Sequence, residues 1–124
     1  MFSFKGKTVV VVGGTSGINL GVAKSFASAG AKVAVISRSQ DKVDSAIASL
    51  QELGAEAIGA SADVRNFDQL TEAVNGFAET FGEFDVVVSG AAGNFPAKAM
   101  DMSPNAFASV VNIDLIGTFH AMKA

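Results

Sequence analysis

The sequence predicts an α/β fold in which helices cover both faces of a parallel sheet. Strand-like runs rich in β-branched residues alternate with stretches in which apolar residues recur at helical spacing, and glycines separate most of them. Strands that alternate with helices pair in parallel, because a right-handed crossover returns the chain to the end where the previous strand began. The pattern fills residues 1–124 without a linker, so we expect one domain with strand order 3-2-1-4.

The first predicted strand, residues 8–12, runs directly into a glycine-rich turn. Its four consecutive valines are typical of a central strand covered on both faces. A helix starts right after the turn, so free N–H groups and the positive end of the helix dipole converge on one spot. We interpret this spot as a pyrophosphate site, formed by Gly13, Thr15, Ser16, Gly17 and Ile18.

Position 19 departs from the usual dinucleotide fingerprint, which has a third glycine there. Asn19 could donate a hydrogen bond to a phosphate oxygen, or it could cap the helix. We favour the cap, with Gly21 providing the close packing in place of the missing glycine.

The next strands are predicted at residues 32–37, 56–61 and 84–89, with a helix before each of them. Ser39 and Asn66 are predicted N-caps of the second and third helices, and Gly30, Gly54 and Gly82 stand where helices end. The predicted inward faces are Val22, Phe26 and Ala29, then Val43, Ile47, Leu50 and Leu53, then Phe67, Leu70, Val74, Phe77 and Phe81.

The last predicted helix begins at Ser103-Pro104, an N-cap followed by proline at the first helical position, and runs to the end of the chain. It has almost no polar face, and a helix that is apolar all round must be covered all round. We therefore expect an incomplete sheet, and a homo-oligomer formed through this helix. Its apolar residues are Phe107, Val110, Val111, Ile113, Leu115, Ile116, Phe119 and Met122.

The end of the second strand distinguishes between two cofactors. Sites for NAD place a carboxylate there to bind the ribose hydroxyls, whereas sites for NADP place an arginine near the 2′-phosphate. This chain has Ser37 and Arg38 and no carboxylate, which favours NADP(H) over NAD. The alternative is that Arg38 is an ordinary solvated charge.

Two further segments follow strand ends. Asp63 could accept a hydrogen bond from an adenine amino group while Val64 packs on the ring, or Asp63 could be a helix-initiating turn residue. Ser89 is followed by Gly90, Ala91 and Ala92, whose small side chains let a ligand approach closely. The carboxyl ends of strands are where open α/β sheets bind ligands.

Two residues of the last helix could carry chemistry. Asp114 falls on an apolar stripe, where a buried carboxylate needs a partner or an unusual protonation state. It could also be satisfied by backbone donors or water at a cavity edge. His120 is a lone histidine near the chain end, and we interpret it as structural. We predict no metal site.

The composition excludes several partner classes. The net charge is −3 and the basic residues are scattered, so we expect neither nucleic-acid nor membrane binding. The chain has no cysteine, no signal-peptide core and no apolar run long enough to span a bilayer. The expectation is a soluble, cytoplasmic protein.

Taken together, these segments resemble the short-chain dehydrogenase/reductase family. Residues 13–18 resemble its glycine motif, residues 63–64 its adenine contact, residues 89–92 its Asn-Asn-Ala-Gly segment, and residues 112–119 its central helix motif. The resemblance covers the whole chain and implies an NADP(H)-binding Rossmann domain. Residues 90–95 and 103–107 are similar to the 2,4-dienoyl-CoA reductases of the peroxisomal type, which implies enoyl or dienoyl thioesters, or related carbonyl or alcohol compounds, as substrates.

The resemblance also implies what this chain lacks. The family places a serine, a tyrosine and a lysine after the central helix, and this chain ends at Ala124 and contains no tyrosine. Asp114 occupies the place of an asparagine that holds a proton-relay water, which implies a supporting catalytic role. We expect the 124 residues alone to be inactive, as the cofactor-binding part of an oxidoreductase. The alternative is a non-catalytic nucleotide-binding or self-association module.

Overall fold

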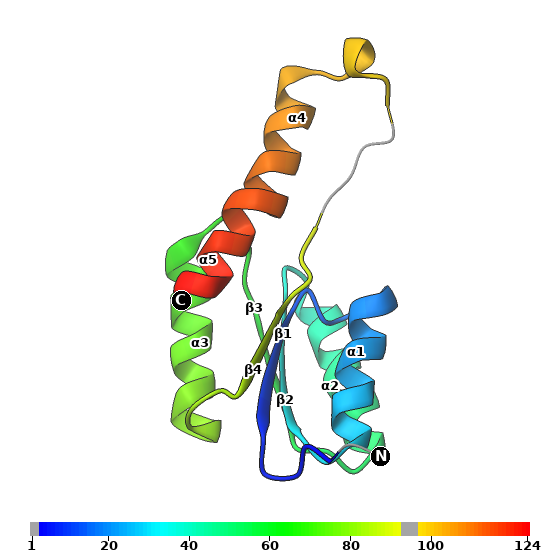
Figure 1. Ribbon diagram of the computed structural model, residues 1–124, viewed down its shortest axis with the longest axis vertical. Coiled ribbons are helices and arrows are strands. Elements are labelled where there is room, and N and C mark those ends of the chain that lie inside the picture. The colour runs from blue at the N-terminus through cyan, green and yellow to red at the C-terminus, as the bar shows by residue number, and fades with distance from the viewer. Residues whose placement is uncertain (1–2, 93–96) are drawn as a thin grey trace.

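A parallel sheet forms the centre of the computed structural model, which describes residues 3–92 and 97–124. Its four strands have the order β3-β2-β1-β4, as the sequence predicts. The strands are β1 (Thr8–Val12), β2 (Lys32–Ser37), β3 (Ala57–Ser61) and β4 (Val86–Ser89). All neighbours pair in parallel, so their carboxyl ends lie at one edge of the sheet, towards the top of Figure 1.

Helices cover both faces of this sheet (Figure 1). The helices α1 (Gly17–Ser28) and α2 (Gln40–Glu52) pack on one face. The helices α3 (Phe67–Phe81) and α5 (Gly117–Lys123) pack on the other. The doubly wound α/β class predicted from the sequence is therefore confirmed.

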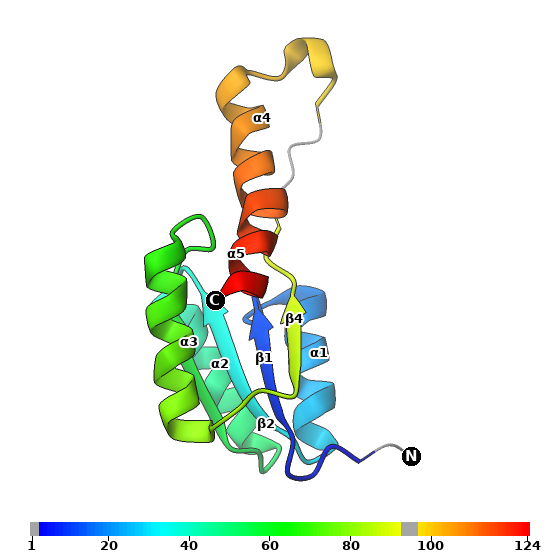
Figure 2. The same ribbon diagram turned by 60° about the vertical axis from the view of Figure 1, so that its left-hand side comes forward.

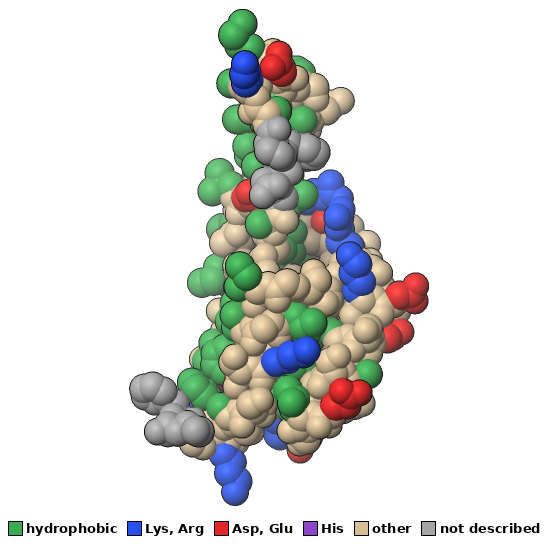
Figure 3. Space-filling view, turned by 90° about the vertical axis from the view of Figure 1, so that its right-hand side faces the viewer, with side chains coloured by type: hydrophobic (Ala, Val, Ile, Leu, Met, Phe, Trp, Pro, Cys, Tyr) green, Lys and Arg blue, Asp and Glu red, His purple; other side chains and the backbone are tan. Residues whose placement is uncertain are grey.

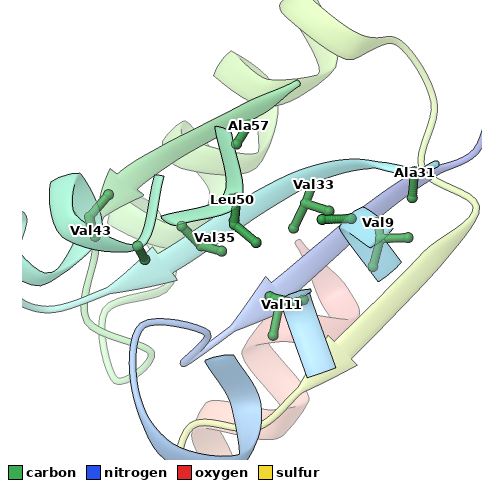
Figure 4. Close-up of a cluster of buried hydrophobic side chains, with 11 residues drawn as sticks. Val9, Val11, Ala31, Val33, Val35, Val43, Leu50 and Ala57 are labelled. Carbon is green, nitrogen blue, oxygen red and sulfur yellow. The ribbon is translucent and has the colours of Figure 1, made fainter. Parts of the chain in front are cut away.

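Alternate side chains of the central strands point into the two layers. Val9 and Val11 lie in the layer beneath α1 and α2, shown in Figure 4, while Val10 and Val12 lie in the layer beneath α3. All four are at most 2% exposed, which explains why the valine run shows no polar alternation. The strand is therefore packed on both faces, and the glycine turn follows directly at its carboxyl end.

The predicted caps of the middle helices are present. The Ser39 side chain accepts a hydrogen bond from the Lys42 amide, and the Asn66 side chain accepts one from the Gln69 amide. Gly30, Gly54 and Gly82 all have positive φ. One predicted core residue is wrong: Leu53 is the C-cap of α2 and is 46% exposed, because the helix ends before it can turn inward.

The inner face of α1 also differs from the prediction. Its fully buried residues are Ala23 and Ala27, while Val22 and Phe26 are half-buried at the side. Small residues let the helix axis approach the sheet closely, and apolar periodicity gives large side chains more weight than alanine.

The C-terminal residues form one long helical run that rises away from the sheet (Figure 2). It consists of α4 (Pro104–Val110), a π-helical segment (Val111–Ile116) and α5, rather than the uniform helix predicted. A single 3₁₀ turn, Ala99–Asp101, precedes it. Within residues 3–92 and 97–124, no helix is long and apolar enough to cross a membrane.

Candidate functional site

A cleft of about 310 Å³ opens at the carboxyl edge of the sheet, between the glycine turn and the ends of the other strands. It brings together most of the residues singled out in the sequence. Of these it is lined by Gly13, Thr15, Ser16, Asn19, Ser37, Arg38, Asp63, Val64, Gly90, Ala91 and Ala92. The sequence did not point to its further lining residues Ile36, Lys42, Ala62 and Ile113.

Gly13 makes the sharp turn that forms the floor of the cleft. Its φ is +83°, a backbone conformation that residues other than glycine rarely adopt. Its amide donates a hydrogen bond of 2.7 Å to the Ile36 carbonyl. A Cβ atom added here would lie 2.8 Å from the Ala91 nitrogen. The backbone of the glycine turn and the backbone of the loop after β4 are therefore so close that position 13 has room for glycine only.

Asn19 joins the same two segments. Its Nδ2 donates a hydrogen bond of 2.7 Å to the Gly90 carbonyl, and α1 has its N-cap at Ser16 instead. The predicted role of Asn19 as a helix cap is therefore wrong. Gly21 also does not provide the predicted close packing, since a Cβ atom added there would meet nothing within 4 Å.

Positive charge gathers at the end of β2. Arg38 is exposed at the cleft and its carbonyl accepts a hydrogen bond of 2.9 Å from the Ser61 hydroxyl, which holds the loop. Lys42 reaches the same cleft from the first turn of α2. Figure 3 shows Lys and Arg side chains gathered at the upper right of the face that it displays. The signal for Lys42 was present in the sequence: an N-cap at Ser39 puts residue 42 in the first helical turn.

Asp63 is the one carboxylate among the cleft-lining residues, and it is paired. Arg65 donates to it through Nη2 at 2.6 Å and Nε at 3.0 Å, and the Arg65 amide donates to it at 2.9 Å. These hydrogen bonds lower the pKa of the Asp63 carboxyl below its ordinary value of 3.8. Asp63 thus acts as a turn residue, as one of the two sequence interpretations has it, and it also lines the cleft. The contact with an adenine amino group remains a prediction.

Three of the predicted site residues lie outside this lining. Gly17 opens α1 with a φ of +58°, and Ile18 is 87% exposed beside Phe4 and Phe26. Asp114 lies in the π-helical segment and is half-buried rather than buried, because the stripe around it is open: Phe107 is 63% exposed. His120 has the structural contacts expected of it, since it bonds the Val64 carbonyl.

Four larger hollows lie elsewhere on the described residues, and two of them, of about 570 and 530 Å³, lie on the outer faces of α3 and α1. Of the other two, one of about 480 Å³ runs between the edge of β3 and α3, and one of about 690 Å³ lies beside β4. These last two are each lined by one glutamate, Glu72 and Glu83 respectively. None of the four larger hollows has a lysine or arginine in its lining, whereas the glycine-turn cleft has Arg38 and Lys42, so this cleft is the site suited to a dinucleotide.

The family follows from a comparison with known proteins. A family model described as short chain dehydrogenase matches residues 7–124. The chain belongs to the short-chain dehydrogenase family. The resemblance seen in the sequence is thereby confirmed, and members of this family are oxidoreductases that bind a nicotinamide dinucleotide.

The relatives of this chain include two reductases. It is 38% identical over 120 residues to the peroxisomal 2,4-dienoyl-CoA reductase of Arabidopsis thaliana, a match covering 97% of this chain and 40% of the relative. It is 40% identical over 125 residues to the peroxisomal 2,4-dienoyl-CoA reductase of Saccharomyces cerevisiae, covering 98% and 43%. The chain thus spans less than half the length of these curated relatives.

Solved structures share the fold of this chain. The actinorhodin polyketide ketoreductase with NADPH is 28% identical, with a TM-score of 0.92 over 99% of this chain and 47% of that one. The NAD⁺-bound xylitol dehydrogenase is 31% identical, with a TM-score of 0.90 over 98% and 47%. The same fold therefore holds either cofactor, and the choice depends on the side chains at the cleft.

Proposed function

We propose that residues 1–124 form the NADP(H)-binding domain of a reductase that acts on enoyl or dienoyl thioesters, or on related carbonyl or alcohol compounds. The observation that carries the choice of cofactor is the charge at the end of β2. Arg38 and Lys42 both face the cleft, and its single carboxylate, Asp63, is already paired with Arg65. A 2′-phosphate there would meet two cations and no unpaired acid.

The remaining lining residues suit the other parts of a dinucleotide. The backbone amides and hydroxyls of Thr15 and Ser16 would hold the pyrophosphate at the start of α1. Asp63 and Val64 would hold the adenine ring, and residues 90–92 present small side chains that let the cofactor lie against the backbone. The glycine-only contact between Gly13 and Ala91 supports this use of the cleft.

The substrate class is proposed from the relatives, which are named as dienoyl-CoA reductases. The nicotinamide ring supplies hydride transfer when the cofactor is bound. Asp114 has a supporting role in positioning the proton that the product receives. Since the sequence contains no tyrosine to act as the family's acid, we propose that the 124 residues alone do not turn over substrate. Reduction of a dienoyl-CoA by a sample of verified intact mass would contradict this.

Calorimetric titration of charge variants tests the cofactor choice. Arg38→Gln and Lys42→Gln should each weaken NADP⁺ binding about 10-fold or more, because each removes a charge-assisted contact to the phosphate. NAD⁺ binding should change by less than about 2-fold. Lys24→Gln, on the exposed face of α1, is the matched control and should leave both affinities unchanged. Equal effects on NADP⁺ and NAD⁺ would contradict a 2′-phosphate contact.

We also propose that the projecting helix associates with a second copy of the chain. Four large apolar side chains on it are more than 60% exposed: Phe107, Leu115, Phe119 and Met122. This surface supports the second candidate function as well, a self-association module without catalysis. Size-exclusion chromatography should give one discrete oligomer, and Phe119→Ser should shift it to smaller species. A monomer at all concentrations would contradict both the association through the projecting helix and the second candidate function, the self-association module.

The remaining partner and location assignments stay predictions. We propose that the chain binds neither nucleic acid nor membranes, on its net charge of −3. A cytoplasmic location remains the expectation from the sequence, although five relatives are named as peroxisomal enzymes. Fractionation of cells that express the natural protein would decide it.

A further inference from the structure

The Asn19 side chain is in direct contact with the Gly90 backbone. Nδ2 of Asn19 donates to the Gly90 carbonyl at 2.7 Å, although the two residues are 71 positions apart. The Gly90 amide donates to the Val12 carbonyl at 2.8 Å. Both polar groups of the Gly90 backbone are therefore satisfied, one by the strand that leads into the glycine turn and one by the helix that follows it.

The same contact explains why residue 90 has no side chain. A Cβ atom added to Gly90 would lie 2.4 Å from Oδ1, 2.5 Å from Cγ and 2.5 Å from Nδ2 of Asn19. The backbone does not exclude a side chain there, since Gly90 is absent from the glycines with positive φ. The obstacle is the amide group of Asn19, which fills the space that a Cβ atom would need.

We propose that Asn19 is a positioning residue and that it forms a matched pair with Gly90, which fixes the wall of the cleft at residues 90–92. The inference rests on the proposed cofactor site, because that wall faces the cleft. The dinucleotide fingerprint has glycine at position 19, where it permits close packing of helix and strand. In this chain α1 carries a side chain at position 19, and the loop after β4 makes room for that side chain by having glycine at position 90.

Two consequences distinguish a matched pair from an isolated hydrogen bond. Removing the amide frees the Gly90 carbonyl and loosens the loop without any steric effect. Adding a methyl group at residue 90 is harmful only while Asn19 is present. The two substitutions should therefore be strongly non-additive, which independent sites are not.

The first experiment needs no cofactor. Hydrogen exchange of the Gly90 amide should become about 5-fold faster in Asn19→Ala, as expected for the loss of one net hydrogen bond, while the amides of β2 stay unchanged. In the thermal unfolding cycle, Gly90→Ala should lower Tm clearly in the natural background. In Asn19→Gly it should change Tm by less than about 1 °C, because the obstacle is gone. Equal losses in the two backgrounds would overturn the matched pair.

The second experiment reads the cofactor site. Under conditions in which each variant is fully folded, Asn19→Ala should weaken NADP⁺ binding about 5-fold. Gly90→Ala should also weaken NADP⁺ binding in the natural background, but not when it is combined with Asn19→Gly. An unchanged affinity in Asn19→Ala would overturn the positioning role. If the natural chain does not bind NADP⁺ at all, the proposed function fails, while the exchange and unfolding cycle still decides whether the pair exists.

Discussion

His120 on α5 donates a hydrogen bond from Nδ1 to the Val64 carbonyl, at 2.6 Å. A carbonyl only accepts, so the proton of the neutral ring must be on Nδ1. This bond ties the C-terminal helix to the turn that forms one wall of the cleft. His120→Ala should lower the free energy of unfolding by about 1–2 kcal/mol, since it leaves a half-buried carbonyl unpaired. Urea denaturation measures this, and a loss below about 0.3 kcal/mol would contradict a structural role for the bond.

Gly117 provides the second contact between α5 and that wall. A Cβ atom at Gly117 would lie 2.6 Å from Cγ2 of Val64, in a buried position. Gly117→Ala should therefore destabilise the fold by about 1–3 kcal/mol, despite the higher helix propensity of alanine. Gly76 is the matched control, an exposed glycine within α3 whose added Cβ would meet nothing within 4 Å. Gly76→Ala should stabilise by about 0.5–1 kcal/mol. A change in the free energy of unfolding of the same sign for Gly117→Ala and Gly76→Ala would contradict the close contact of Gly117 with Val64.

The Asp63 pKa makes stability depend on pH at the acidic end. Hydrogen bonds from Arg65 lower the pKa of the Asp63 carboxyl in the folded chain. The resulting stabilisation is present above the unfolded pKa and is lost as the pH falls through the folded one. Arg65→Gln should return the Asp63 pKa towards 3.8 and remove that part of the acid dependence. Carbon NMR titration of the carboxyl measures it, and an unchanged pKa would exclude Arg65 as the cause.

Asp85 closes the amino end of the sheet through a reciprocal pair of hydrogen bonds with Thr8. The Thr8 amide donates to Oδ2 of Asp85 at 2.8 Å, and the Asp85 amide donates to the Thr8 carbonyl at 2.9 Å. Asp85→Ala should cost about 1–3 kcal/mol, because Thr8 is 4% exposed and its amide would lose its partner. Asp85→Asn keeps an acceptor oxygen and should cost less than half as much. Equal losses in thermal unfolding would mean that the side-chain acceptor is unimportant.

The strand order could be predicted because it depends on local patterns. The valines at 9–12 and the helix caps at Ser39 and Asn66 are each readable within a few residues of sequence, and handedness rules then restrict how the strands connect. The cleft residues at strand ends followed from the same order, because parallel strands bring their carboxyl ends together.

What the sequence missed depends on contacts between distant residues. The partner of Asn19 lies 71 positions away, and no local feature distinguishes an amide that bonds Gly90 from one that caps a helix. The burial of Ala23 and Ala27 in place of larger neighbours reflects how closely α1 approaches the sheet. The π-helical segment before Gly117 has no local signature that we could use.

The central claim is that the glycine-turn cleft binds NADP(H). Amide NMR spectra of the ¹⁵N-labelled chain, titrated with NADP⁺, test both binding and its place in one measurement. We expect the largest shifts at cleft residues from all four strand ends: Gly13, Ser37, Arg38, Asp63 and Ala91. NAD⁺ should give weaker shifts, with the difference concentrated at Arg38. An absence of shifts at saturating NADP⁺, or shifts confined to the groove between β3 and α3, would contradict the account.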